Sequence, residues 1–390
     1  MGQLIRPYYY QNEHPSMTSH QLTLIANPYA ESGALETLPD TEGLKVLTKE
    51  ELLSNPHIFS PSEKIICTSE SVLDLLIASL DLADPRASAI QQMKDKHLFR
   101  TLTSAINPDF YFKEFHPAEL ESLSLDPESR YVLKPSKGCF GTGVRTFTGS
   151  ADLNAIGHEI IAEIERNSSV LSDSVLSNDR LILEEYIAGE EYAVDVFFDS
   201  QGEVHITNIF HHPMPKNSAY LHMLYYSSRD THNLIYPLAI DFFEELSSQL
   251  DLRNMPIHSE FRLVNGALIP IELNPMRFGG MGLTNLNSPT LGINAYQQFI
   301  EESERDWAAT WNSQPELVNV FFIAYNGTHI DKTTHQPNWP LLRDHFSEII
   351  REIPFKYQQQ LAFGVLILRE EQSLLAELLA IDFDDYFLPI

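Results

Sequence analysis

Two glutamates on either side of an Asn-Gly dipeptide have the spacing that points most directly to chemistry. Asn265-Gly266 suits a two-residue type I′ turn, so the flanking runs are expected to pair as an antiparallel hairpin. Glu260 and Glu272 lie five and six residues from this turn, near-opposite each other on the two arms. Like charges facing each other destabilise a sheet, so the pair indicates a bound cation.

Asn274 would add a third oxygen to this cation site. It lies two residues beyond Glu272 and therefore faces the same side of the strand. Hard oxygen donors favour Mg²⁺, with Mn²⁺ as an alternative, whereas a pair of unrelated surface glutamates is the competing interpretation. His258 would share the face of Glu260, and we expect it to support that acid by hydrogen bonding rather than to act as a catalyst.

A glycine-rich loop follows an expected strand at residues 131–135. Lys134 ends the strand, and Gly138, Gly141 and Gly143 follow. Glycines let backbone N–H groups converge on an anion, and the lysine adds a positive charge, which is typical of a phosphate cradle. The segment lacks the Gly-Lys-Ser/Thr of a Walker loop, and an ordinary glycine-rich hairpin loop remains the alternative.

Four carboxylates lie within residues 184–191, between two expected strands: Glu184, Glu185, Glu190 and Glu191. A solvated acidic turn would explain them. The alternative is a nucleotide hinge, in which backbone groups bind an adenine edge and one carboxylate accepts hydrogen bonds from ribose hydroxyls.

Arg277 and the flexible run Phe278-Gly279-Gly280-Met281-Gly282 come just after the expected metal ligands. A permanent cation there would stabilise developing charge, whereas a structural salt bridge is the alternative. His211, His212 and His222 lack the ligand spacing of a zinc site, and we expect them in loops.

The elements that must position these residues follow from hydrophobic periodicity. The first part of the chain alternates short strands with helices and predicts a parallel α/β unit, with strands at 21–26, 44–48 and 64–67 and helices from 49 and over 71–80. Pro85 should break the pattern before an amphipathic helix over 90–105 that contains Lys94 and Lys96. Mainly antiparallel strands are expected later, at 131–135, 181–187, 192–198, 203–210, 257–264, 267–273, 318–325 and 361–368, with helices at 152–165, 234–250 and 370–380.

Composition narrows the function classes. At ~150 residues per domain, 390 residues predict two to three domains. The formal net charge of -28 argues against nucleic acid and anionic membranes as partners. Cys67 and Cys139 support neither a disulfide framework nor a four-cysteine zinc site, so a reducing cytoplasmic location is the simplest expectation. Apolar runs fall short of the ~20 residues that a spanning helix needs, and a homodimer is the default oligomer.

The order of these motifs resembles that of the ATP-grasp superfamily of carboxylate-amine ligases. The motifs are the Asp95-Lys96 helix, the Lys134 strand with its loop, the 184–191 hinge, and the hairpin of Glu260 and Glu272 with the residues up to 280. The likeness covers roughly residues 60–305. It implies three parts: an N-terminal parallel α/β domain that precedes the ATP-grasp fold (1–92), an ATP-grasp region with antiparallel sheets (93–305) and a C-terminal α+β segment (306–390).

The resemblance also implies roles for single residues. ATP would be bound by Lys96 and Lys134 at the phosphates, by Gly138, Gly141 and Gly143 in the loop closing over them, by Glu184, Glu185 and Ile187 at the adenine hinge, and by Glu191 at the ribose. Mg²⁺ would be bound by Glu260, Glu272 and Asn274, with Arg277 at the acyl centre. In many relatives the arginine directly follows Asn-Pro, whereas Met276 intervenes here. The resemblance therefore does not decide in which direction the Arg277 side chain points.

The activity implied is ATP-dependent joining of a small-molecule carboxylate to an amine through an acyl phosphate. The triplet His258-Ser259-Glu260 is similar to that of the amino-acid ligase branch and favours an amino acid as the amine. A ligase or carboxylase with another nucleophile and a nucleotide-binding module without turnover are the alternatives.

Overall fold

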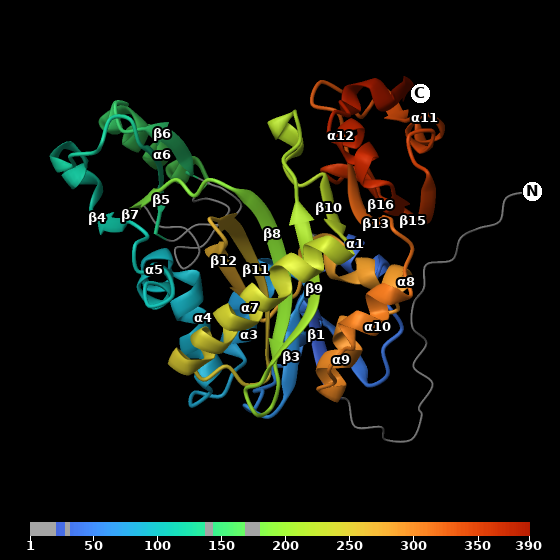
Figure 1. The fold of residues 1–390 in the computed structure, drawn as a ribbon, viewed down its shortest axis with the longest axis horizontal. Coiled ribbons are helices and arrows are strands. Elements are labelled where there is room, and N and C mark those ends of the chain that lie inside the picture. Colours follow the sequence, from blue (N-terminus) through green and yellow to red (C-terminus); the bar gives the residue numbers. More distant parts are fainter. Residues whose placement is uncertain (1–20, 28–31, 137–142, 168–179) are drawn as a thin grey trace, which may run out of the picture.

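The computed structural model describes residues 21–27, 32–136, 143–167 and 180–390 (Figure 1). Within these ranges the strands form a three-stranded, a four-stranded and an eight-stranded sheet and one two-stranded pair. In Figure 1 the four-stranded sheet lies at the upper left of the molecule and the C-terminal segment at the upper right.

The N-terminal unit is built on a parallel sheet in the order β2-β1-β3, which confirms the predicted α/β rhythm. Its elements are β1 (Leu22–Ala26), α1 (Ser32–Glu36), β2 (Leu44–Thr48), α2 (Lys49–Ser54), β3 (Lys64–Cys67), a 3-10 turn η1 (Glu70–Val72) and α3 (Leu73–Ala78). Thr48 and Glu51 form a capping box that fixes where α2 begins.

The single helix expected over 90–105 is in fact two, α4 (Pro85–Lys94) and α5 (Lys96–Thr103). Asp95 separates them because its carboxylate accepts from the backbone N–H groups of His97 and Leu98, both at 3.0 Å, and so caps α5. Pro85 does not end a pattern as expected; it is the first residue of α4, where a missing N–H costs nothing.

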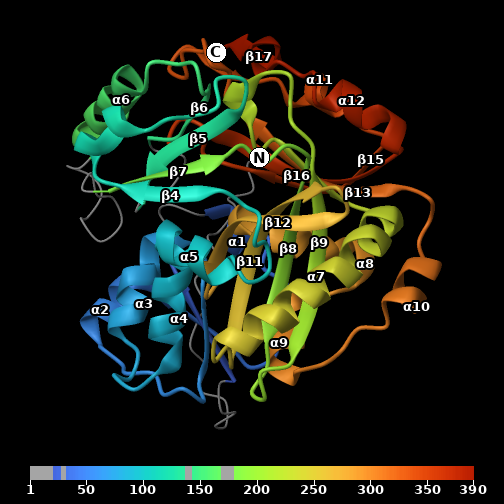
Figure 2. The same cartoon turned by 60° about the vertical axis from the view of Figure 1, so that its left-hand side comes forward.

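The four-stranded sheet is antiparallel in the order β4-β7-β5-β6. It contains β4 (Phe112–Phe115), β5 (Arg130–Pro135), β6 (Arg145–Thr148) and β7 (Leu181–Glu185), and it is covered by α6 (Leu153–Asn167). Its apolar face packs on α6 through buried side chains that include Leu133, Ile160 and Leu183. Figure 2 shows the opposite side of this sheet above α5 and the β11–β12 hairpin.

The eight-stranded sheet is antiparallel in the order β12-β11-β8-β9-β10-β13-β16-β15. Its strands are β8 (Glu190–Phe198), β9 (Val204–His212), β10 (Leu224–Ser227), β11 (Met255–Val264), β12 (Ala267–Pro275), β13 (Val318–Tyr325), β15 (Glu348–Pro354) and β16 (Ala362–Glu370). The long helix α7 (Arg229–Gln249) packs on it through Phe242, Phe243 and Leu246.

The C-terminal segment continues this sheet with β13, β16 and β15. The expected helix over 370–380 is shorter than predicted, a 3-10 turn followed by α12 (Leu375–Leu378). The remaining α-helices and β-strands of the described residues are α8 (Asn287–Leu291), α9 (Ala295–Glu301), α10 (Trp307–Asn312), β14 (His335–Pro337), α11 (Trp339–Arg343) and β17 (Phe387–Pro389). The α/β and α+β fold class is therefore confirmed, whereas the boundaries at 92 and 305 stay predictions.

Candidate functional site

The β11–β12 hairpin places Glu260 and Glu272 directly opposite each other. Beyond that pair, Phe261 aligns with Pro270, so Ile271 is an extra residue in β12 and forms a bulge. The bulge explains how positions five and six residues from the turn become partners. The turn itself has positive φ at Asn265 and Gly266, as a type I′ turn requires.

Behind Glu260, His258 is held by a buried aspartate on β8. The His258 Nδ1 atom lies 2.7 Å from Asp195 Oδ1, and its Nε2 atom lies 3.7 Å from Glu260. Burial alone would lower the pKa of His258, but hydrogen bonds with Asp195 and Glu260 outweigh it and raise the pKa to about 9. The imidazolium in turn lowers the pKa of Glu260 against the effect of burial. This matches the supporting role expected for His258.

Asn274 connects the carboxylate pair to cations outside the hairpin. Its amide Nδ2 donates to Glu272 at 2.7 Å, and its Oδ1 accepts from Lys94 Nζ at 3.1 Å. Lys94 also pairs with Glu70 at 2.8 Å, and Glu70 lies 3.6 Å from Arg277. Sequence reasoning missed Lys94 and Glu70 as site residues. Lys94 could have been found from the sequence, because it lies two residues before Lys96 near a helix end. Nothing in the sequence indicates Glu70, because its partners are distant along the chain.

The donor set fits a hard divalent ion. Glu260, Glu272 and Asn274 share one face of the hairpin, and the like charges of the two carboxylates need a cation between them. The Asn274 amide now turns its Nδ2 to Glu272 and its Oδ1 to Lys94, so Asn274 would offer its oxygen to an ion only after the amide rotates. In the described ranges, no three His, Cys, Asp or Glu residues gather as a metal site. The remaining coordination positions would therefore belong to water or to phosphate oxygens.

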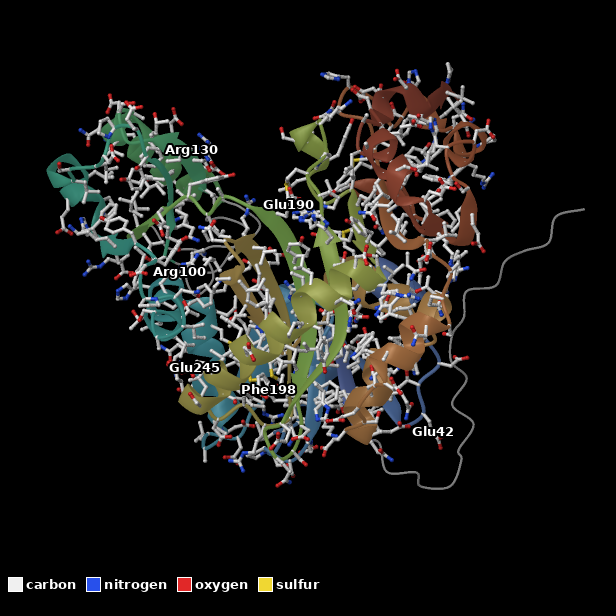
Figure 3. All side chains as sticks on the ribbon, in the orientation of Figure 1. Glu42, Arg100, Arg130, Glu190, Phe198 and Glu245 are labelled. Atoms are coloured by element: carbon white, nitrogen blue, oxygen red, sulfur yellow. The ribbon has the colours of Figure 1, made fainter. Side chains whose placement is uncertain are left out.

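Lys134 lies on β5 and belongs to a buried ion-pair network. Its Nζ is 2.9 Å from Glu184 on β7, and the other partner of Glu184 is Arg100, at 2.9 Å through each of two N–H groups. Burial would raise the pKa of Glu184, but Lys134 and Arg100 lower it to about 2. Arg100, labelled in Figure 3 near α5, also donates to the Pro270 carbonyl at 2.6 Å and so ties the four-stranded sheet to the hairpin.

Lys96 begins α5 close to Lys134. Its backbone N–H donates to the Ser136 carbonyl at 3.1 Å. Burial and the neighbouring cations Lys134 and Lys94 lower the pKa of Lys96 to about 8. Three ammonium groups so near one another attract an anion. Gly138 and Gly141 of the expected phosphate cradle lie outside the described residues, whereas Gly143 lies at its end with φ +71°.

The hinge residues divide between the two faces of β7. Glu184 faces Lys134, so Glu185 faces the other way, and its carboxylate accepts from the Tyr111 N–H at 3.3 Å. There it helps to line a cavity of about 510 Å³ with Tyr131 and Tyr186. A nucleotide contact of Glu185 on the Lys134 side would therefore have to come from its backbone. The Ile187 carbonyl accepts from Arg262 at 3.2 Å.

Glu191, the expected ribose ligand, is fixed by two cationic or polar neighbours. His212 Nδ1 lies 2.7 Å from one of its oxygens, and Arg262 lies 3.0 Å from the other. The expectation that the histidines lie in loops is wrong for His211 and His212, which end strand β9. His212 stacks on Tyr225 with ring centroids 4.0 Å apart, and this stacking holds it against Glu191.

Residues 128–285 match the family model described as "ATP-grasp domain". Among solved structures, the fold is similar to an L-amino acid ligase from Bacillus licheniformis, with 16% identity, a TM-score of 0.65 and coverage of 96% of this chain and 99% of that one. Carboxyaminoimidazole ribonucleotide synthase from Aspergillus clavatus, solved with ATP, has 13% identity, a TM-score of 0.58 and coverage of 92% and 96%.

A third similar structure is the biotin carboxylase domain of Hydrogenobacter thermophilus 2-oxoglutarate carboxylase, solved as a dimer with MgADP and bicarbonate. It has 12% identity, a TM-score of 0.54 and coverage of 90% of this chain and 86% of that one. No curated protein sequence matches significantly. Among the described residues, no helix has both the length and the apolar character to cross a membrane. The comparisons confirm the predicted fold and family resemblance, and the predicted class of ATP-dependent ligase agrees with the ligase and synthase names.

Proposed function

We propose that the protein is an ATP-dependent carboxylate-amine ligase, and the match of residues 128–285 to the ATP-grasp domain model is the premise of this proposal. A carboxylate oxygen of the acid attacks the γ-phosphorus of ATP and gives an acyl phosphate and ADP. The amine nitrogen then attacks the acyl carbon, phosphate leaves with the bonding electron pair, and the amine loses a proton. The product is an amide, and we propose an amino acid as the amine.

The facing of Glu260 and Glu272 beside Asn274 is the observation that carries this proposal. When bound there, Mg²⁺ supplies positive charge that neutralises phosphate oxygens during transfer. The hairpin contributes by holding its oxygens on one face, with Glu260 kept ionised by His258. A protein that only bound nucleotide would have less need of three such oxygens and a neighbouring arginine.

Lys134 and Lys96 would bind the phosphates from the four-stranded sheet and α5. Glu184 would orient Lys134 rather than meet adenine with its side chain, because both carboxylate oxygens already accept from cations. Glu191 would accept from the ribose hydroxyls, with His212 and Arg262 fixing its position. With these roles, the nucleotide would lie between the four-stranded sheet and the hairpin.

Two alternatives follow from the same fold. In the first alternative, the nucleophile is not a free amino acid. It is bicarbonate in a carboxylase, and a thiol or an amine carried by a protein in another ligase. A nucleotide-binding module without turnover is the alternative from another class. The L-amino acid ligase among the similar structures favours an amine as the nucleophile. At 16% sequence identity, this support comes from the likeness of the folds alone.

A hydroxylamine trap tests the proposal and identifies the acid. The protein is incubated with Mg-ATP, hydroxylamine and one member of an amino-acid and carboxylic-acid panel at a time, and hydroxamate and ADP are measured. We expect hydroxamate with at least one acid, in equal amount to ADP. Nucleotide binding without hydroxamate for any acid would favour the binding module, and ADP formation that needs bicarbonate would favour the carboxylase.

A further inference from the structure

The residue that interrupts the Asn-Pro-Arg pattern creates a fixed turn. Met276 is buried and has φ +62°, a left-handed conformation that is costly for a residue with a Cβ atom. Two backbone hydrogen bonds of 2.7 Å hold it there. Its N–H donates to the Pro256 carbonyl, and its carbonyl accepts from the Cys67 N–H. The direction in which Arg277 leaves β12 is therefore set by this turn.

The segment that binds the turn also reaches Arg277 with a side chain. Cys67 ends β3, and Glu70 follows three residues later at the start of η1. Glu70 Oε1 lies 3.6 Å from the Arg277 guanidinium and 2.8 Å from Lys94 Nζ. The N-terminal unit thus contacts the end of β12 twice, once through backbone and once through a carboxylate.

Glu70 holds two cations that both adjoin the predicted metal ligands. Lys94 bridges Glu70 and Asn274, whereas Arg277 follows Asn274 closely in sequence. One carboxylate between two cations leaves one positive charge on the group. The Arg277 Nε–H is buried and has no hydrogen-bond partner among the described residues. A buried donor with that charge around it suits an anionic group of a ligand.

We propose that Glu70 is a positioning residue for the ligase reaction. It aims Arg277, and holds Lys94 beside it, so that the two cations together receive the carboxylate of the acid substrate and the charge that develops at its carbonyl oxygen. The inference rests on the proposed function and deepens it, since it places the acid where the N-terminal unit meets the hairpin. A salt bridge that only holds the two parts together is the competing explanation.

The test compares Glu70→Gln and Glu70→Asp with wild type in the hydroxamate assay, with the acid and ATP varied separately. Misaimed cations should lower kcat/KM for the acid by about 10- to 100-fold, whereas KM for ATP changes less than about 2-fold. Glu70→Asp keeps the charge and should recover part of the loss. Glu63→Gln is the matched control, because Glu63 is a carboxylate of the same unit that pairs with His57 outside the site. It should behave as wild type.

A double-mutant cycle separates positioning from a structural role. If Glu70 acts through Arg277 and Lys94, the loss caused by Glu70→Gln should be smaller in an Arg277→Gln background than in wild type, because only the Lys94 contact is left to lose. Thermal midpoints and Mg-ADP binding establish that each variant is folded. Additive losses in the cycle, or Glu70→Gln with wild-type kcat/KM for the acid, would overturn the inference while leaving the ligase in place. A wild-type protein that forms no hydroxamate with any acid would overturn the proposed function and the inference with it.

Discussion

Single side chains at the site balance opposing charges. Glu260 has His258 beside it. Glu272 accepts a hydrogen bond from Asn274 and interacts electrostatically with the buried Lys96 and Lys134. We expect Glu272→Gln to lower ADP formation by about 100-fold or more, because charge stabilisation of the transferring phosphoryl group is lost. Measurement of ADP release over a range of Mg²⁺ concentrations checks this.

The thermal midpoint of Glu272→Gln should equal or exceed that of wild type, since the change removes a repulsion across the hairpin. Glu352→Gln is the control for a lost carboxylate, because Glu352 pairs with Arg343 in an exposed ion pair far along the chain. Normal ADP formation by Glu272→Gln would remove the metal assignment.

Sequence reasoning could find residues whose partners are close along the chain. Glu260 and Glu272 were predicted to face each other because a turn of known type joins their strands, and the structure confirms this. Arg100 and Glu70 could not be found in this way. Arg100 reaches Glu184, and Glu70 reaches Arg277, across contacts that exist only once separate sheets and helices are packed together.

Among the elements, the β11–β12 turn depends on backbone conformation alone. Gly266 has φ +83°, and a Cβ added there would meet no atom within 4 Å. Gly266→Ala should therefore lower the free energy of unfolding by about 1 kcal/mol through backbone strain, with little change in activity. Urea unfolding measures the loss. Asn265→Gly, which relieves a positive φ instead, serves as the comparison and should change stability by only a few tenths.

Helix α7 carries a histidine that makes stability depend on pH. Burial lowers the pKa of His232 from 6.5 to about 4, where it lies among Trp307, Trp311 and Tyr236. From pH 6.5 down to 4 the unfolded chain binds a proton that the folded chain does not, so stability falls as pH falls. Wild type should lose about 1 kcal/mol more than His232→Phe between pH 7.5 and 5.5.

Urea unfolding of both proteins at the two pH values checks this prediction. Phenylalanine keeps an aromatic ring against Trp307 but does not titrate, so the rest of the pH dependence is shared. The lower pH stays above the sequence pI of about 4.8 to limit association. Equal losses in wild type and variant would show that His232 is protonated as easily in the folded protein as in the unfolded chain.

The ends of helices and strands could be predicted where the local sequence alone decides them. They could not be predicted where one residue suits two different local structures. Strands 44–48, 64–67 and 318–325 were predicted at their observed bounds. The hydrophobic pattern over 90–105 continues across the gap between two helices, because Asp95 is both the C-cap of α4 and the N-cap of α5. Strand order could not be predicted, since β10 lies between β9 and β13 through pairings that local sequence does not specify.

At the scale of the whole molecule, the C-terminal segment shares its core with earlier residues. β13 lies between β10 and β16, and Tyr220, Met223 and Leu224 are buried together with Phe363 and Phe383. A chain that ends at residue 305 would expose this apolar surface and leave β10 as an edge strand. We expect the truncated chain to aggregate or to lack a cooperative thermal transition, measured by circular dichroism and size-exclusion chromatography. A soluble truncated chain with a wild-type thermal midpoint would contradict this.

Because Ile271 is an extra residue in β12, the number of residues between the turn and Glu272 decides on which side of the hairpin Glu272 lies. Successive side chains of β12 point to alternate sides of the hairpin, so one residue gained or lost between the turn and Glu272 would send Glu272 and Asn274 to the far side. Two residues gained or lost would keep both on the same side but would move Glu272 out of line with Glu260. Single insertions at this position should therefore abolish ion binding even where the protein still folds.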